Sequence, residues 1–269
     1  MDDERFDQLW DEIWTLLEEG NSEEAVAKAL HALNEGGDDP EIRFLLGVAL
    51  LDAGEPEAAI PELEQTTDEI PDWAEAHAAL GWARFRACDF EAAAETADVA
   101  LELGPKLADA HELRGLIAER AGDDLRARRE LALARRLDPE RYPKPVEMSE
   151  TEFLDVAQAA VAELDEEIRE VLEDTSLFVQ PFPADELLKD ADPPLDPQIL
   201  GLFVGRSLLD RSVSESGAMP NAMYLFQRNL ERSAATRREL EDEIRITVLH
   251  EIGHHLGWDE DDLEERGLA

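Results

Sequence analysis

Eleven residues near the C-terminus, HEIGHHLGWDE at 250–260, contain three histidines and three carboxylates, all side chains that bind metal ions. On a helix, residues four apart lie on one face, so His250 and His254 would point the same way. His255 would lie about 140° around the helix from His250. This helix can therefore offer at most two of its three histidines to one ion.

The pattern HExxH on a helix predicts a zinc site, with His250 and His254 as ligands. Zinc accepts neutral imidazole nitrogens, and a catalytic zinc keeps one coordination position for water. The ion lowers the pKa of that water towards about 7. Glu251 would then take the proton of the water and pass it to the leaving amine. The pattern predicts one Zn²⁺ per chain and a hydrolytic reaction.

The third protein ligand must come from outside the helix. Gly257 lies seven residues after His250, and a glycine with positive φ can end the helix and turn the chain back. Glu260, ten residues after His250, is the first candidate after that turn. Asp259 is the second candidate and Asp261 the third.

A helix from about residue 235 to residue 255 or 256 would carry these side chains. Its residues Ile244, Val248 and Ile252 form an apolar face, and the two candidate ligands lie nearly opposite. We expect the apolar face to pack on a core and His255, which falls near that face, to be buried.

The segments before this helix predict a small α+β domain at 150–269. Ser149 and Glu152 form a capping box in front of an amphipathic helix that runs to about residue 173. TSLFVQPFP at 175–183 and NAMYLFQ at 221–227 read as strands, and ILGLFVGR at 199–206 as a strand or a buried turn.

Three stretches of this half, TVLHEIGHHLGWDEDDLEERG, ILGLFVGRSLLDRS and MPNAMYLFQRNLER, resemble the small bacterial zincin-like metallopeptidases. The resemblance implies a minimal zincin fold with His250 and His254 as ligands, Glu251 as the base and the acid at 260 as the third ligand. Glu260 stands where the family more often has aspartate. The resemblance also implies that a peptide substrate adds to the edge strand before the active-site helix. We expect this strand at Ala222, Met223, Tyr224, Leu225 and Phe226.

The first half repeats every 34 residues. Three series of small or helix-ending residues share this period: Gly47, Gly81 and Gly115; Ala25, Ala59, Ala93 and Ala127; Pro71, Pro105 and Pro139. The period and these positions resemble the tetratricopeptide (TPR) family, which implies an α-solenoid of helix–turn–helix pairs. We expect four repeats within 5–140, at 5–38, 39–72, 73–106 and 107–140, and a proline-rich linker at 141–149.

One stripe of the first helices carries acids at the repeat period, and aromatic residues lie beside it. The acids are Asp7, Glu41, Glu75 and Asp109, and the aromatic residues are Trp14, Phe44, Trp82 and Phe85. The aromatic residues either pack between repeats or line a groove with the acids. A groove of this kind would bind a basic, partly apolar peptide from a partner, a substrate or the chain itself.

The composition of the chain argues against several classes of function. The 269 residues include 66 acids and 25 Lys or Arg, a net charge of −41, which argues against nucleic-acid or anionic-membrane binding. The acidic N-terminus is no secretory signal, no apolar run is long enough for a membrane span, and the single cysteine excludes an internal disulfide, so we expect a cytoplasmic protein.

The sequence predicts a zinc-dependent peptidase whose repeats recruit a substrate or partner. The alternative is a non-enzymatic adaptor whose zincin-like domain binds zinc structurally or is inactive. The presence of Glu251 argues against this alternative, since a structural zinc site needs no general base.

Overall fold

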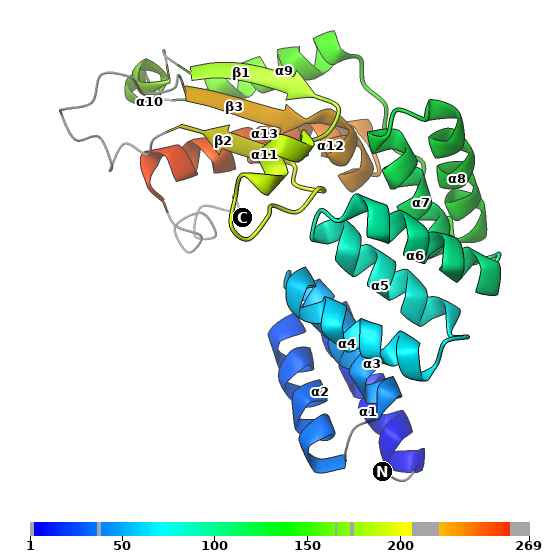
Figure 1. Ribbon diagram of the computed structural model, residues 1–269. Helices are drawn as coiled ribbons and strands as arrows, with labels where there is room; N and C mark the ends of the chain where they lie inside the picture. The colour runs from blue at the N-terminus through cyan, green and yellow to red at the C-terminus, as the bar shows by residue number, and fades with distance from the viewer. Residues whose placement is uncertain (1–2, 37–38, 165, 173–174, 206–220, 259–269) are drawn as a thin grey trace. The chain divides into compact units, whose positions relative to one another are not determined.

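The computed structural model describes residues 3–36, 39–164, 166–172, 175–205 and 221–258 (Figure 1). The chain divides into two compact units. The first comprises Met1–Tyr142 with Lys189–Asp196, and the second comprises Pro143–Leu188 with Pro197–Ala269.

The described part of the first unit is built from four pairs of helices. The pairs are α1 (Asp3–Glu18) with α2 (Ser22–Gly36), α3 (Pro40–Asp52) with α4 (Pro56–Glu69), α5 (Ala74–Arg86) with α6 (Phe90–Leu103), and α7 (Ala108–Arg120) with α8 (Asp124–Leu137). The turn within each pair contains a residue with positive φ. Three of these residues are glycines, Gly20, Gly54 and Gly122, and the fourth is Cys88 with φ of 62°. At this exception, the Cys88 thiol donates to the carbonyl oxygen of Leu195 at 3.4 Å.

Glycine in the first helix of a pair permits close helix contact, as the repeat pattern predicts. A β-carbon at Gly47 would lie 2.5 Å from Leu63 Cγ, and one at Gly115 would lie 2.6 Å from Leu131 Cδ2. The side chains of the second helix therefore occupy the space that a larger residue would need.

Residues 189–196 lie between two segments of the second unit in the chain but belong to the first unit. Arg86 of α5 forms an ion pair with Asp196 at 2.5 Å, and Lys189 Nζ lies 5.5 Å from the centre of the Phe90 ring. Together with the Cys88 contact, these interactions fix the segment on the third helix pair.

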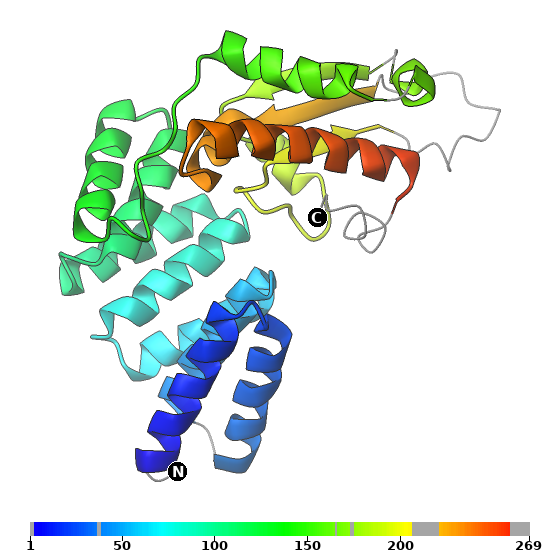
Figure 2. The same cartoon turned by 180° about the vertical axis from the view of Figure 1, so that it is seen from behind.

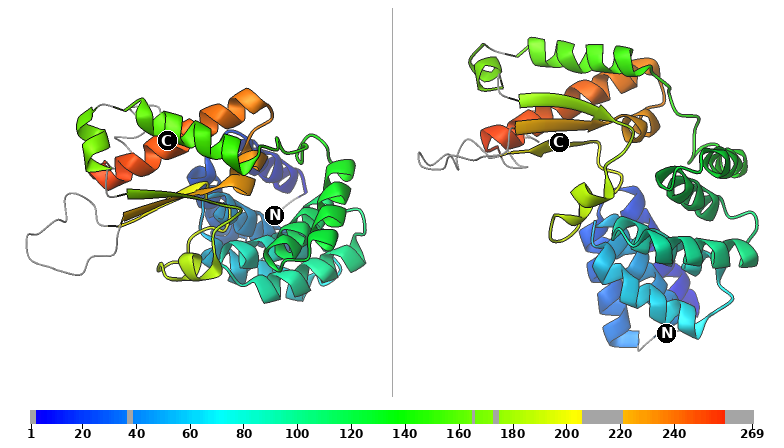
Figure 3. Two further views of the ribbon diagram at one scale, coloured as in Figure 1. Left: turned by 90° about the horizontal axis from the view of Figure 1, so that it is seen from above. Right: turned by 45° about the horizontal axis from the view of Figure 1, so that its top comes forward.

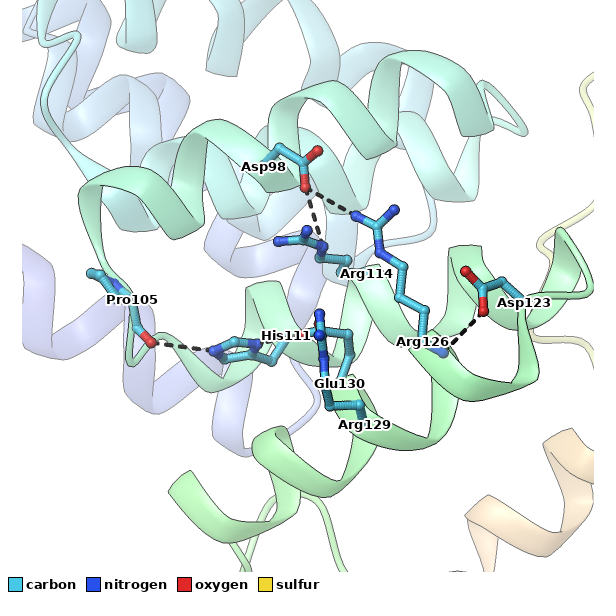
Figure 4. Close-up of polar contacts among 8 residues, drawn as sticks. All are labelled: Asp98, Pro105, His111, Arg114, Asp123, Arg126, Arg129 and Glu130. Carbon is cyan, nitrogen blue, oxygen red and sulfur yellow. Dashed lines mark hydrogen bonds and ion pairs between the residues drawn. The ribbon is translucent and has the colours of Figure 1, made fainter.

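His111 has a structural role in the fourth repeat (Figure 4). Its Nδ1 lies 2.7 Å from Glu130 Oε2, and its Nε2 lies 3.2 Å from the Pro105 carbonyl oxygen. Burial raises the pKa of Glu130, but hydrogen bonds from Arg129 and His111 and the charge of Arg114 outweigh burial and hold that pKa below its usual range. His111 thus ties α7 to α8 and to the preceding turn.

The second unit contains a three-stranded sheet and five helices among the described residues. The helices are α9 (Glu150–Ala162), α10 (Glu166–Val171), α11 (Asp185–Lys189), α12 (Gln227–Ser233) and α13 (Arg237–Leu256), with α11 ending on the first residue of the segment 189–196. The strands are β1 (Thr175–Gln180), β2 (Gly201–Val204) and β3 (Asn221–Phe226). Helices α9 and α13 lie on one face of the sheet (Figures 2 and 3). Ser149 and Glu152 form the predicted capping box of α9.

The strand order is β1-β3-β2, with β1 parallel and β2 antiparallel to β3. Residues 222–225 of β3 pair with β1 on one side and β2 on the other. The prediction that Ala222–Phe226 is an edge strand is therefore wrong. Its alternation of side chains predicted a strand but not its neighbours, which depend on pairing between distant segments.

Candidate active site

Helix α13 begins and ends at capping interactions that the sequence encodes. Thr236 and Glu239 form a capping box at its start. Gly257 ends it with φ of 88°, and the Trp258 amide donates to the Gly253 carbonyl oxygen at 3.0 Å. The predicted helix and its glycine stop at Gly257 both occur in the structure.

The apolar face of α13 packs into the core of the second unit. Ile244, Val248 and Ile252 are at most 1% exposed and belong to one cluster of buried side chains. His255 is also 1% exposed, and its ring stacks on Phe203 with 4.2 Å between ring centres. The predicted burial of His255 is confirmed, and the packing fixes the rotation of the helix.

His250 and His254 come together on another face of α13. Their Nε2 atoms are 2.9 Å apart, and the rings are inclined at 85°. Two nitrogens bound tetrahedrally to zinc at about 2.0–2.1 Å stand roughly 3.3 Å apart. The two imidazoles therefore fit a shared zinc ion with a shift of a few tenths of an ångström.

Glu251 follows His250 in the chain and is 8% exposed. Its Oε2 accepts a hydrogen bond of 2.8 Å from the Phe203 backbone amide on β2. A β-carbon at Gly201 would lie 3.0 Å from both Cγ and Oε1 of Glu251. Neither contact was predicted from the sequence, although an isolated glycine within a strand can indicate a close approach by another group.

The three candidates for the third ligand, Glu260, Asp259 and Asp261, lie outside the described residues. Within the described ranges, no group of three or more His, Cys, Asp or Glu side chains has a geometry suited to a metal ion. The described part of the site thus comprises two imidazoles and the carboxylate of Glu251.

The candidate groove of the repeats needs a correction. Phe44 and Phe85 are 5% and 2% exposed, because their rings pack inside helix-pair cores, so they cannot line a groove. Phe44, for example, lies 4.4 Å from Trp73 between ring centres. Trp14 and Trp82 are partly buried against the same cores.

The acids of the stripe occupy different environments. Glu41 and Glu75 are exposed in the first turns of α3 and α5, where a negative charge complements the helix dipole. Asp7 is exposed on α1. Asp109 accepts a 2.7 Å hydrogen bond from Tyr142 and lies 3.1 Å from Arg141. Two residues of its own unit therefore already bind its carboxylate.

Comparison with known families identifies both halves. A model of zincin-like metallopeptidases matches residues 172–268, and two tetratricopeptide-repeat models match residues 16–83 and 78–141. The chain joins tetratricopeptide repeats to a zincin-like metallopeptidase domain. The predicted fusion and fold class are confirmed. No curated protein matches the chain significantly.

Solved TPR structures resemble about half of the chain. TTC0263, a thermophilic TPR protein of Thermus thermophilus, is 20% identical over 50% of this chain and 75% of its own, with a TM-score of 0.47. YrrB, described as a TPR protein with an unusual peptide-binding site, is 20% identical over 49% and 68%, with a TM-score of 0.42. MamA of Desulfovibrio magneticus RS-1 is 23% identical over 49% and 74%, with a TM-score of 0.43.

None of the described helices is long and apolar enough to cross a membrane.

Proposed function

We propose that the protein is a zinc-dependent peptidase whose zinc ligands include His250 and His254. The observation that carries the proposal is the 2.9 Å approach of their Nε2 atoms, with the Glu251 carboxylate on the adjoining residue. Imidazole nitrogens are ligands that zinc prefers, and a carboxylate beside them supplies the base that hydrolysis needs. Glu260 is proposed as the third ligand, with Asp259 and Asp261 as alternatives.

Zinc, when bound, would supply Lewis acidity that lowers the pKa of a water to about 7. Glu251 would accept the proton of that water and donate it to the leaving amine. The backbone amide of Phe203 donates to Oε2 of Glu251 and so holds the carboxylate at β2 before reaction. The burial of Glu251 limits competing hydrogen bonds from bulk water.

We further propose that the substrate adds as a strand along β2, since β3 is paired on both sides. The edge of β2 carries the amide that contacts Glu251, so a strand bound there would run past the proposed base. This replaces the expected docking position on Ala222–Phe226.

The repeats would recruit a substrate or partner protein, as TPR arrays commonly do. Asp7, Glu41 and Glu75, with the partly buried Trp14 and Trp82, remain the proposed contact residues. The net charge of −41 favours a basic segment and disfavours nucleic acid or an anionic membrane. A cytoplasmic location completes the proposal and agrees with the single cysteine.

Zinc content and peptide cleavage of the purified full chain test this function. We expect about one zinc per chain and cleavage of a mixed peptide library. A variant with both His250→Ala and His254→Ala should lose zinc and cleavage together. Zinc retained at full stoichiometry in that variant would refute the site. Zinc binding without cleavage would favour a non-enzymatic adaptor.

A further inference from the structure

Along β2, the backbone amide and carbonyl groups point alternately towards β3 and away from it. The Phe226 amide donates to the Leu200 carbonyl oxygen at 2.9 Å, and the same register pairs Leu202 with Tyr224. In an antiparallel ladder, Leu200 and Leu202 then direct their amide and carbonyl groups towards β3, and the alternate residues direct theirs away. The amide and carbonyl groups of Gly201 and Phe203 therefore point to the outer edge of β2.

Glu251 occupies part of this outer edge. Its Oε2 accepts from the outward Phe203 amide at 2.8 Å. Within the described ranges, β3 is the only strand that pairs with β2, so this carboxylate binds the donor that an added strand would use.

The contact is built into the local packing. Gly201 leaves space for the Glu251 side chain along the strand, since a β-carbon there would lie 3.0 Å from Oε1. Thr247, one turn earlier on α13, would lie 2.7 Å from the same β-carbon through its Cγ2. Any larger residue at 201 would force the side chains of Thr247 and Glu251 to move. The absence of a side chain at 201 thus permits the carboxylate to reach the edge.

We infer that Glu251 closes the edge of β2 in the resting protein, and that a peptide adding as a strand must displace it from the Phe203 amide. This inference rests on the proposed function. Because one amide donates one strong hydrogen bond, the peptide carbonyl and the carboxylate compete for it. Docking of an extended peptide then releases Glu251 from β2 for proton transfer. The edge therefore favours extended substrates over compact ones.

Two substitutions at Glu251 separate this role from the role as a base. Glu251→Gln and Glu251→Ala both remove the base, so neither consumes a bound peptide. The glutamine keeps a carbonyl oxygen that can accept from the Phe203 amide, whereas alanine keeps no acceptor. Both changes also remove the same charge, so electrostatic attraction of a peptide changes equally.

The experiment measures binding of a capped peptide, acetyl-(Lys-Val)₃-amide, to each zinc-loaded full-length variant. We expect Glu251→Ala to bind it about fivefold tighter than Glu251→Gln, the factor that corresponds to one net hydrogen bond. Amide hydrogen exchange at Phe203 provides a second measurement without peptide. It should be slow in the wild type and in Glu251→Gln, and faster in Glu251→Ala.

Equal exchange rates at Phe203 in the two variants, or equal peptide affinities including no measurable binding by either, would overturn the inference. Neither measurement needs turnover. A wild type that cleaves no peptide but shows the expected exchange pattern would refute the proposed function and leave the edge contact standing.

Discussion

Gly201→Ala should damage catalysis without touching a proposed zinc ligand. The added β-carbon would lie 2.7 Å from Thr247 Cγ2 and 3.0 Å from Glu251 Cγ and Oε1. Ordinary carbon contacts are about 3.5–4.0 Å, so the neighbouring side chains must shift by roughly 0.5–1.3 Å. A misplacement of about 1 Å can slow a reaction about 100-fold, and overpacking costs about 1–3 kcal/mol of stability. We expect kcat/KM to fall by about 10- to 100-fold with zinc content unchanged.

The assay compares kcat/KM on one peptide, zinc stoichiometry and melting temperature between wild type and variant. Gly201→Ala combined with Thr247→Ser is the matched control, because serine lacks the methyl group that makes the closest contact. The double variant should recover part of the stability and part of the activity. Wild-type kcat/KM and melting temperature in the single variant would show that Glu251 does not depend on this contact.

Three further predictions concern the repeats and the charge. Gly115→Ala should lower the unfolding free energy by about 1–2 kcal/mol, since the clash with Leu131 outweighs the helix propensity gained; an unchanged melting temperature would contradict it. The pKa of Glu130 is lowered in the folded protein, so its stabilisation is present above the unfolded value of about 4.3 and is lost as pH falls through the folded value. In Glu130→Gln, the unfolding free energy should therefore fall less steeply as the pH is lowered into the acid range. An unchanged pH dependence would contradict this role of Glu130. With a net charge of −41, the melting temperature should rise as NaCl goes from low to moderate concentration, whereas a flat or falling curve would show local pairing of the acids.

Local patterns predicted much of the fold. The 34-residue period specified the helix pairs, because small residues recur at this period where helices touch, as at Gly47. The apolar face of α13 and its stop at Gly257 followed from helical periodicity and from the conformational freedom of glycine. The approach of His250 to His254 followed from their spacing alone.

Features that depend on distant segments were not predictable in the same way. The central position of β3 depends on pairing with β1 and β2 from elsewhere in the chain. The burial of Phe44 and Phe85 depends on which side of each helix meets its neighbours. The segment 189–196 packs with the first unit through Arg86 and Cys88, and only the replacement of glycine by Cys88 in the repeat pattern marked that turn as different.

Turnover of wild type and Glu251→Gln at equal, measured zinc occupancy tests directly whether Glu251 is the base of a zinc peptidase. Glutamine preserves the shape of the side chain but cannot accept the proton of the attacking water. We expect full zinc occupancy in both proteins, peptide cleavage by the wild type, and a loss of at least about 100-fold in kcat for the variant. Cleavage by Glu251→Gln at the wild-type rate would contradict the assignment of Glu251 as the base.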